Sequence, residues 1–156
     1  RCDLGDVIKV EGVFLPTPVV RFLRREGEVI SLTGEKVTGE QLVQALSEVL
    51  PGAGSGFAVH GVLEERPHLA VALEAPISRD LVHRFDKALC RLNREYEGKR
   101  SSGRYEPPRL HSVPAGAFDR WRAERVHGGA ADAQVKDPIT VTGPVFDRLL
   151  RGWGPS

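Results

Sequence analysis

The chain has 156 residues, of which 40% are hydrophobic and 28% charged, and this composition fits one compact domain. Its 22 basic and 21 acidic residues leave a formal charge of +1, which argues against a general electrostatic surface for nucleic acid or anionic membrane. No apolar run approaches the ~18 residues of a membrane-spanning helix. We therefore expect a soluble, cytoplasmic protein that binds neither nucleic acid nor membrane. Because the sequence contains no methionine, we also expect it to be part of a longer protein.

The first segment predicts a two-stranded arm. Residues 6–14 and 19–24 alternate apolar and polar side chains, and two prolines punctuate the connection at residues 15–18. A short strand is expected at residues 28–32, followed by a turn at residues 33–36.

A helix is expected to begin at Thr38. Its hydroxyl can accept an N-terminal amide while Gln41 reaches back in a capping box. Leu42, Leu46 and Val49 then recur at helical spacing and predict the buried face.

The middle of the chain predicts a sheet and a long helix. Residues 56–63 and 68–73 are β-rich and close enough to form an antiparallel pair at the sheet centre. Ser78 caps a helix whose apolar positions are Leu81, Val82, Phe85, Ala88, Leu89, Leu92 and Tyr96. A loop at residues 98–104 precedes a strand at 110–113, a helix at 117–125 and a last helix near 145–150.

The element order after residue 27 is β-α-β-β-α-β. It predicts an α+β fold in which helices pack on a small mixed or antiparallel sheet. Ferredoxin-like regulatory modules, ligand-binding domains and enzyme lids share this order, so it does not specify a function.

Several polar residues could carry chemistry, and each also has a plain structural interpretation. Asp6 could bind a pair of ribose hydroxyls or cap a turn, and residues 24–27 could form an interdomain hinge or a solvated turn. Lys36 precedes a helix N-terminus, where an anion is favoured. Lys136 lies in a glycine-rich stretch and could reach a phosphate or remain a surface lysine.

Other residue types predict no separate site. The five histidines lack the spacing of metal ligands, and Cys2 and Cys90 are too few for a disulfide scaffold or a metal cluster. The basic run at residues 99–104 could contact a phosphate or a partner, but solvated surface is the favoured interpretation. Trp121 is expected in a core or interface, whereas the environment of Trp153 stays open.

Taken together, the motif order resembles that of the Gretchen Hagen family of acyl-acid amido synthetases, within the luciferase-like adenylating superfamily. The resemblance covers nearly the whole chain. The segments that carry it are DLGDV at 3–7, Thr17 and Pro18, VRF at 20–22, RR at 24–25, SLTGEK at 31–36, Tyr96, KR at 99–100, Pro108, VPAGAF at 113–118 and QVK at 134–136, before Pro138.

This resemblance implies a ligase that uses ATP and Mg²⁺ to activate a carboxylic acid as acyl-AMP, which an amine, such as an amino acid, then attacks. Asp6 would match a ribose-binding aspartate. Phe22 and Arg25 would line the nucleotide pocket, and Lys36 would contact the nucleotide after the hinge. Lys136 would match the lysine that enters the site during adenylation.

The resemblance also implies a division of the chain. Residues 1–25 would be the end of a large N-terminal domain plus the hinge, and residues 26–156 the mobile C-terminal α+β domain. The phosphate-binding loop and acyl pocket would lie in the N-terminal domain, so we expect the 156 residues alone to be inactive. A thiol acceptor is a further possibility, and the abundance of Arg, Ala and Gly suggests a bacterial source. The alternative from another class is a non-catalytic, ferredoxin-like ligand-binding or interaction module.

Overall fold

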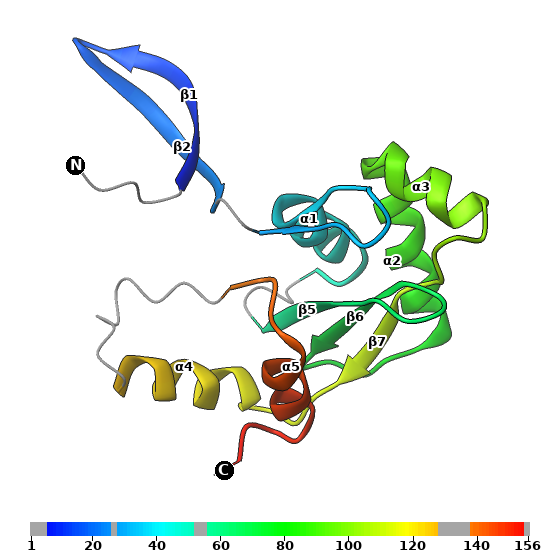
Figure 1. Cartoon of the computed structure of the whole chain (residues 1–156). Coiled ribbons are helices and arrows are strands. Elements are labelled where there is room, and N and C mark those ends of the chain that lie inside the picture. The colour runs from blue at the N-terminus through cyan, green and yellow to red at the C-terminus, as the bar shows by residue number, and fades with distance from the viewer. Residues whose placement is uncertain (1–5, 26–27, 52–55, 128–137, 155–156) are drawn as a thin grey trace.

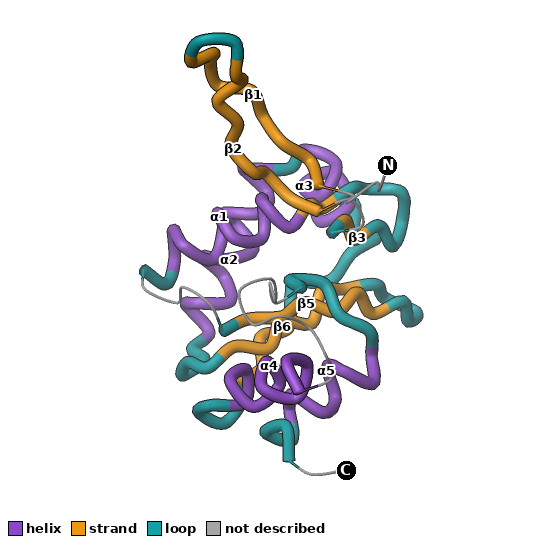
Figure 2. Tube along the Cα trace, turned by 90° about the vertical axis from the view of Figure 1, so that its left-hand side faces the viewer, coloured by secondary structure: helices purple, strands orange, loops and turns teal. Residues whose placement is uncertain are grey.

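The computed structural model describes residues 6–25, 28–51, 56–127 and 138–154. A β-hairpin projects from a body in which a small sheet lies between two groups of helices (Figure 1). The view turned by 90° shows the same three layers and the hairpin standing away from them (Figure 2).

The hairpin is the predicted arm. Strands β1 (Asp6–Phe14) and β2 (Thr17–Arg25) pair antiparallel, with pairing irregularities after Val7 and after Val10. Leu15, at the tip, has a positive φ of 55°. Phe14 and Leu15 expose 72% and 78% of their surface, so the hairpin is not part of the core of the body.

A two-stranded ribbon follows the hairpin. Strands β3 (Val29–Ile30) and β4 (Val37–Thr38) pair antiparallel and lead into helix α1 (Gly39–Val49). The predicted capping box is confirmed, because Gln41 N donates to Thr38 Oγ1 and Thr38 N donates to Gln41 Oε1. The strand predicted at 28–32 is shorter, since the amide of Leu32 donates to a side chain instead of a strand.

The central sheet has the order β5-β6-β7. Strands β5 (Phe57–Val62) and β6 (His68–Leu73) form the predicted antiparallel pair, and β7 (Arg109–Ser112) runs parallel to β6. The sheet is therefore mixed, with β6 at its centre and β5 at one side. The β3–β4 ribbon stays outside this sheet, so the described strands do not form one ferredoxin-like sheet.

Alternation along β6 explains the layers. All of its residues are buried, and the two faces differ in size. Leu69, Val71 and Leu73 join the core beneath α1, α2 (Arg79–Leu92) and α3 (Arg94–Ser101). Ala70 and Ala72 face the second core, where aromatic side chains of α4 (Ala117–His127) and α5 (Gly143–Leu150) fill the space that the small residues leave.

The single helix predicted to extend to Tyr96 is wrong. Asn93 follows the last residue of α2 and is also the N-cap of α3. Its side chain accepts a 2.9 Å hydrogen bond from the amide of Tyr96 in the first turn of α3. The loop predicted at 98–104 is also partly wrong, because residues 98–101 belong to α3. An asparagine N-cap followed by glutamates in the first turn explains the break, since both satisfy the amides at a helix start.

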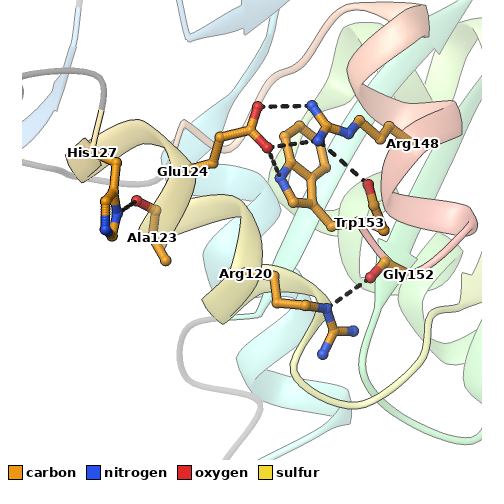
Figure 3. Close-up of polar contacts among 8 residues, drawn as sticks. Arg120, Ala123, Glu124, His127, Arg148, Gly152 and Trp153 are labelled. Carbon is orange, nitrogen blue, oxygen red and sulfur yellow. Dashed lines mark hydrogen bonds and ion pairs between the residues drawn. The ribbon is translucent and has the colours of Figure 1, made fainter. Parts of the chain in front are cut away.

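The C-terminal residues dock on α4. Glu124 of α4 accepts hydrogen bonds of 2.6 and 2.8 Å from Arg148 of α5 and one of 3.0 Å from the indole of Trp153, as Figure 3 shows. Arg120 donates to the carbonyl of Gly152 at 2.9 Å. Trp153 is consequently 8% exposed and lies in the second core together with Trp121. None of the described helices has the length and apolar character needed to cross a membrane.

Candidate functional site

A tight turn links the two strands of the ribbon and carries Lys36. We call residues 32–36 the Glu35 turn. The Glu35 carboxylate is fully buried and accepts from the amides of Leu32 (2.8 Å) and Thr33 (2.9 Å) and from the Thr33 hydroxyl (2.7 Å). Gly34 has a φ of 99°, which a residue with a Cβ rarely adopts. The turn is thus organised around one carboxylate.

The charge of Glu35 is maintained by these donors. Burial alone would raise its pKa, but the hydrogen bonds from Leu32 and Thr33 outweigh that effect and leave the pKa below its ordinary value. Because the pKa of Glu35 is lower in the folded chain than in the unfolded chain, its carboxylate stabilises the fold at pH values above the unfolded pKa. This stabilisation is lost as the pH falls through the folded pKa.

We expect Glu35→Gln to lower the free energy of unfolding by about 1–3 kcal/mol at pH 7, because its amide nitrogen would face N–H donors. Wild type should lose stability below about pH 4.5, and the variant should lack that component. Urea unfolding of the 156-residue chain at pH 7 and pH 3.5 measures both effects, with Glu64→Gln as the exposed control. Equal stability of Glu35→Gln and wild type at pH 7 would show that the carboxylate does not hold the turn.

Helix α3 and its cap hold the Glu35 turn from outside. The Lys36 amide donates to Glu95 Oε2 at 3.2 Å, and the Lys36 carbonyl accepts from Asn93 Nδ2 at 2.8 Å. Lys99 Nζ donates to the carbonyl of Thr33 at 2.7 Å. The backbone of Lys36 is therefore fixed on both sides while the residue itself is exposed. An ammonium on a fixed backbone is suited to contact a phosphate or another anion.

Tyr105 lies close enough to Glu35 to feel its charge. It is 1% exposed, and both burial and the charge of Glu35 raise its pKa. Its ring packs edge-on against Tyr96 with the centroids 5.3 Å apart. Within the described residues its hydroxyl has no hydrogen-bond partner.

An open pocket of about 480 Å³ lies between the Glu35 turn and α3. Gly34 and Glu35 line one side. The other residues that line it come from α3 and from the segment that follows, and include Arg94, Lys99 and Arg104. This volume lies within the range of small-molecule sites.

The structure brings three of the five predicted site residues together in the hairpin. Asp6 and Arg25 are direct partners at its base, and Phe22 lies opposite Ile8. Lys36 lies beyond residues 26–27, in the Glu35 turn. Lys136 falls outside the described residues.

Residues that flank the predicted hinge and lysine segment lie side by side. The carbonyl of Glu28 accepts from the Gly39 amide at 2.8 Å, and its carboxylate accepts a long hydrogen bond of 3.5 Å from Ile139 N. Ile139 O and Val141 N also pair with Val59 of β5 at 2.7 and 2.9 Å. Residues 139–141 are therefore held beside Glu28, where the body begins after the hairpin.

The sequence did not single out Glu35 or Asn93, although both organise this region. Asn93 carried a detectable signal, since it is an N-cap residue followed by acidic side chains. Glu35 carried none, because a glutamate in a glycine turn is ordinarily solvated. Among the residues that the structure describes, no three His, Cys, Asp or Glu side chains gather into a metal-binding group.

Comparison with known proteins identifies the family. Residues 40–144 match the model of the GH3 family C-terminal domain. The chain belongs to the GH3 family. This finding confirms the resemblance to the Gretchen Hagen (GH3) family that the sequence motifs indicated.

Two mammalian GH3 relatives support this membership. A human GH3 domain-containing protein is 31% identical over 165 residues, which cover 97% of the chain and 29% of the relative. A mouse GH3 domain-containing protein is 32% identical over 133 residues, covering 76% of the chain and 25% of the relative. The chain thus spans less than a third of the length of these relatives.

Solved structures share the fold. The GH3.15 acyl acid amido synthetase matches with a TM-score of 0.77 at 21% identity, over 94% of the chain and 29% of the synthetase. The AtGH3.15 acyl acid amido synthetase in complex with 2,4-DB matches with a TM-score of 0.74 at 19% identity, over 96% of the chain and 30% of that synthetase. The predicted α+β fold of a GH3 C-terminal domain is confirmed.

Proposed function

We propose that this chain is the C-terminal part of an ATP-dependent acyl-acid amido synthetase. In the first half-reaction, a carboxylate oxygen bonds to the α-phosphorus of ATP and pyrophosphate leaves, which gives acyl-AMP. In the second, an amine, such as that of an amino acid, attacks the acyl carbon and AMP leaves with formation of the amide. The observation that carries this proposal is GH3 membership together with a fold match to an acyl acid amido synthetase over 94% of the chain.

The proposal divides the chain near residue 25. Residues 1–25 would complete a large N-terminal domain and form the hinge, and residues 26–156 would be the mobile domain. The hairpin supports this division, because Val13, Phe14 and Leu15 are each more than 70% exposed and lie outside both described cores. The N-terminal domain is the partner that we propose for this apolar surface. Without its phosphate loop and acyl pocket, the chain alone would be inactive.

Four residues near the hinge would hold the nucleotide. Asp6 would accept hydrogen bonds from the ribose hydroxyls, while Phe22 and Arg25 line the pocket. Their common hairpin, with Asp6 paired to Arg25, supports a shared site. Lys36 would supply a cation from its fixed backbone. Mg²⁺ would bind the phosphates of ATP, whose α-phosphorus is the electrophile. We assign no described residue as a ligand of this ion.

Lys136 would stabilise charge during adenylation. Attack on the α-phosphate accumulates negative charge, which a placed ammonium can stabilise. In support, Ile139, which follows Lys136 in the chain, donates a long hydrogen bond of 3.5 Å to Glu28, where the body begins.

We expect Asp6→Ala to raise the KM for ATP of the intact enzyme by ~10-fold or more, since the variant loses hydrogen bonds to a charged acceptor. Initial rates at saturating acid and varied ATP measure this effect. Glu11→Ala, which removes an exposed carboxylate from the same hairpin, should leave the KM unchanged. An unaltered KM in Asp6→Ala would remove Asp6 from nucleotide binding.

The reaction class is tested by its products. Intact enzyme is incubated with ATP, a panel of carboxylic acids, and either amino acids or coenzyme A, and the products are separated by mass spectrometry. The proposal expects AMP and an amide in equal amounts. Formation of ADP, or of a thioester in place of the amide, would contradict it, and an absence of acid-dependent ATP consumption would favour the non-catalytic module.

We further propose a cytoplasmic location, where ATP is available.

A further inference from the structure

The pocket between the Glu35 turn and α3 is not used by the proposed synthetase reaction. Its volume of about 480 Å³ exceeds what an inorganic ion needs and fits part of a small organic molecule. Arg94, Glu95, Gly98 and Lys99 line it from α3, at the spacing that places residues on one helix face. Arg104 lines it from the segment after the helix.

The basic side chains that line the pocket outnumber the acidic ones, and Glu35 is already held by donors of its own turn. Glu35 accepts from its own turn, and Glu95 accepts from the Lys36 amide. Lys99 donates once, to the Thr33 carbonyl, and an ammonium has three donors. Arg94 and Arg104 form no ion pair with any residue in the described part of the chain. With three basic and two acidic side chains, the lining of this pocket carries an excess of positive charge.

Gly98 provides an independent indication. Glycine in the middle of a helix is unfavourable relative to most residues. A Cβ at Gly98 would meet no atom within 4 Å, and its φ is not positive, so neither packing nor backbone conformation requires glycine here. Its effect is to leave space in the pocket wall. A local rule broken without a structural reason is typical of a functional position.

We propose that this pocket binds a small molecule through a phosphate group. The planar guanidinium groups of Arg94 and Arg104 would each donate to phosphate oxygens, and Lys99 would contribute a compact charge. Because the Glu35 turn forms the opposite wall, the bound group would contact both α3 and the segment that carries Lys36. This inference does not depend on the proposed synthetase activity.

Titration of the ¹⁵N-labelled 156-residue chain with inorganic pyrophosphate tests the proposal. We expect saturable shifts of the Gly34 and Gly98 amide signals, and we expect sodium acetate at equal ionic strength to produce none. An absence of saturable shifts at these two amides, or equal shifts with acetate, would overturn the proposal.

Three variants separate binding from folding. R94Q/R104Q should weaken pyrophosphate binding by ~10-fold or more, since each charge-assisted contact is lost. R79Q, which removes a single positive charge at the far end of α2, should change it by less than about twofold. Gly98→Gln should also weaken binding by ~10-fold while raising the melting temperature, because it fills the pocket with a better helix former. Unchanged binding in R94Q/R104Q or in Gly98→Gln, or an equal loss in R79Q, would overturn the proposal.

Discussion

Replacing Lys136 by alanine is expected to lower acid-dependent ATP–pyrophosphate exchange by the intact enzyme at least ~10²-fold, as loss of a charge-stabilising group does. The ammonium would act on charge that develops in the transition state, so kcat should fall while the KM for ATP changes little. Exchange of labelled pyrophosphate into ATP, at saturating acid, measures this step without the amine.

The matched control is Lys87→Ala, which removes an exposed lysine from the solvent side of α2. It should leave exchange unchanged. Full exchange activity in Lys136→Ala would remove this residue from the mechanism, whereas a rise in KM alone would assign it to nucleotide binding instead of adenylation.

The second large effect concerns folding. We expect Asp86→Ala to lower the free energy of unfolding by about 3 kcal/mol, near the lower end of the range for breaking a buried ion pair. Arg100 Nη2 donates to Asp86 at 2.7 Å and its Nε at 3.0 Å, and the Tyr96 hydroxyl donates to the same carboxylate at 2.7 Å. The side chains of Arg100 and Asp86 are only 18% and 15% exposed, so the variant leaves a largely buried cation without its partner.

This cluster also holds the segment after α3, because Arg100 donates to the carbonyl of Tyr105 at 2.7 Å. Urea unfolding of the 156-residue chain measures the loss of stability. Asp80→Ala breaks an exposed pair with Arg84 and should cost no more than about 0.5 kcal/mol. If the two variants lost the same stability, the Asp86 cluster would have no special role in holding α2 and α3 together.

Local signals in the sequence predicted those elements whose hydrogen bonds are local. The Thr38 and Gln41 capping box and the 57–73 strand pair formed as expected, because their partners lie close in sequence. The break at Asn93 was missed, since the apolar spacing of α2 continues past it to Tyr96. Helical periodicity identifies a buried face, but it does not show where one helix ends and the next begins on the same face.

The sequence predicted less of the candidate site than of the fold. Asp6, Lys36 and Lys136 carried a local signal, whereas Phe22 and Arg25 were assigned to the nucleotide pocket only through the family resemblance. The roles of all five stay predictions. The contacts that fix the backbone of Lys36 come from Asn93 and Glu95, which are 57 and 59 residues away in the chain. Such pairing depends on how α3 packs against the ribbon, which no local pattern in the sequence reports.

We propose that the chain supplies part of an adenylating site that a preceding domain completes. Its most direct test compares ATP–pyrophosphate exchange by the intact enzyme and by the 156-residue chain, across a panel of carboxylic acids. We expect acid-dependent exchange by the intact enzyme and none by the chain alone. Exchange by the isolated chain, or the absence of exchange by the intact enzyme with every acid, would contradict it.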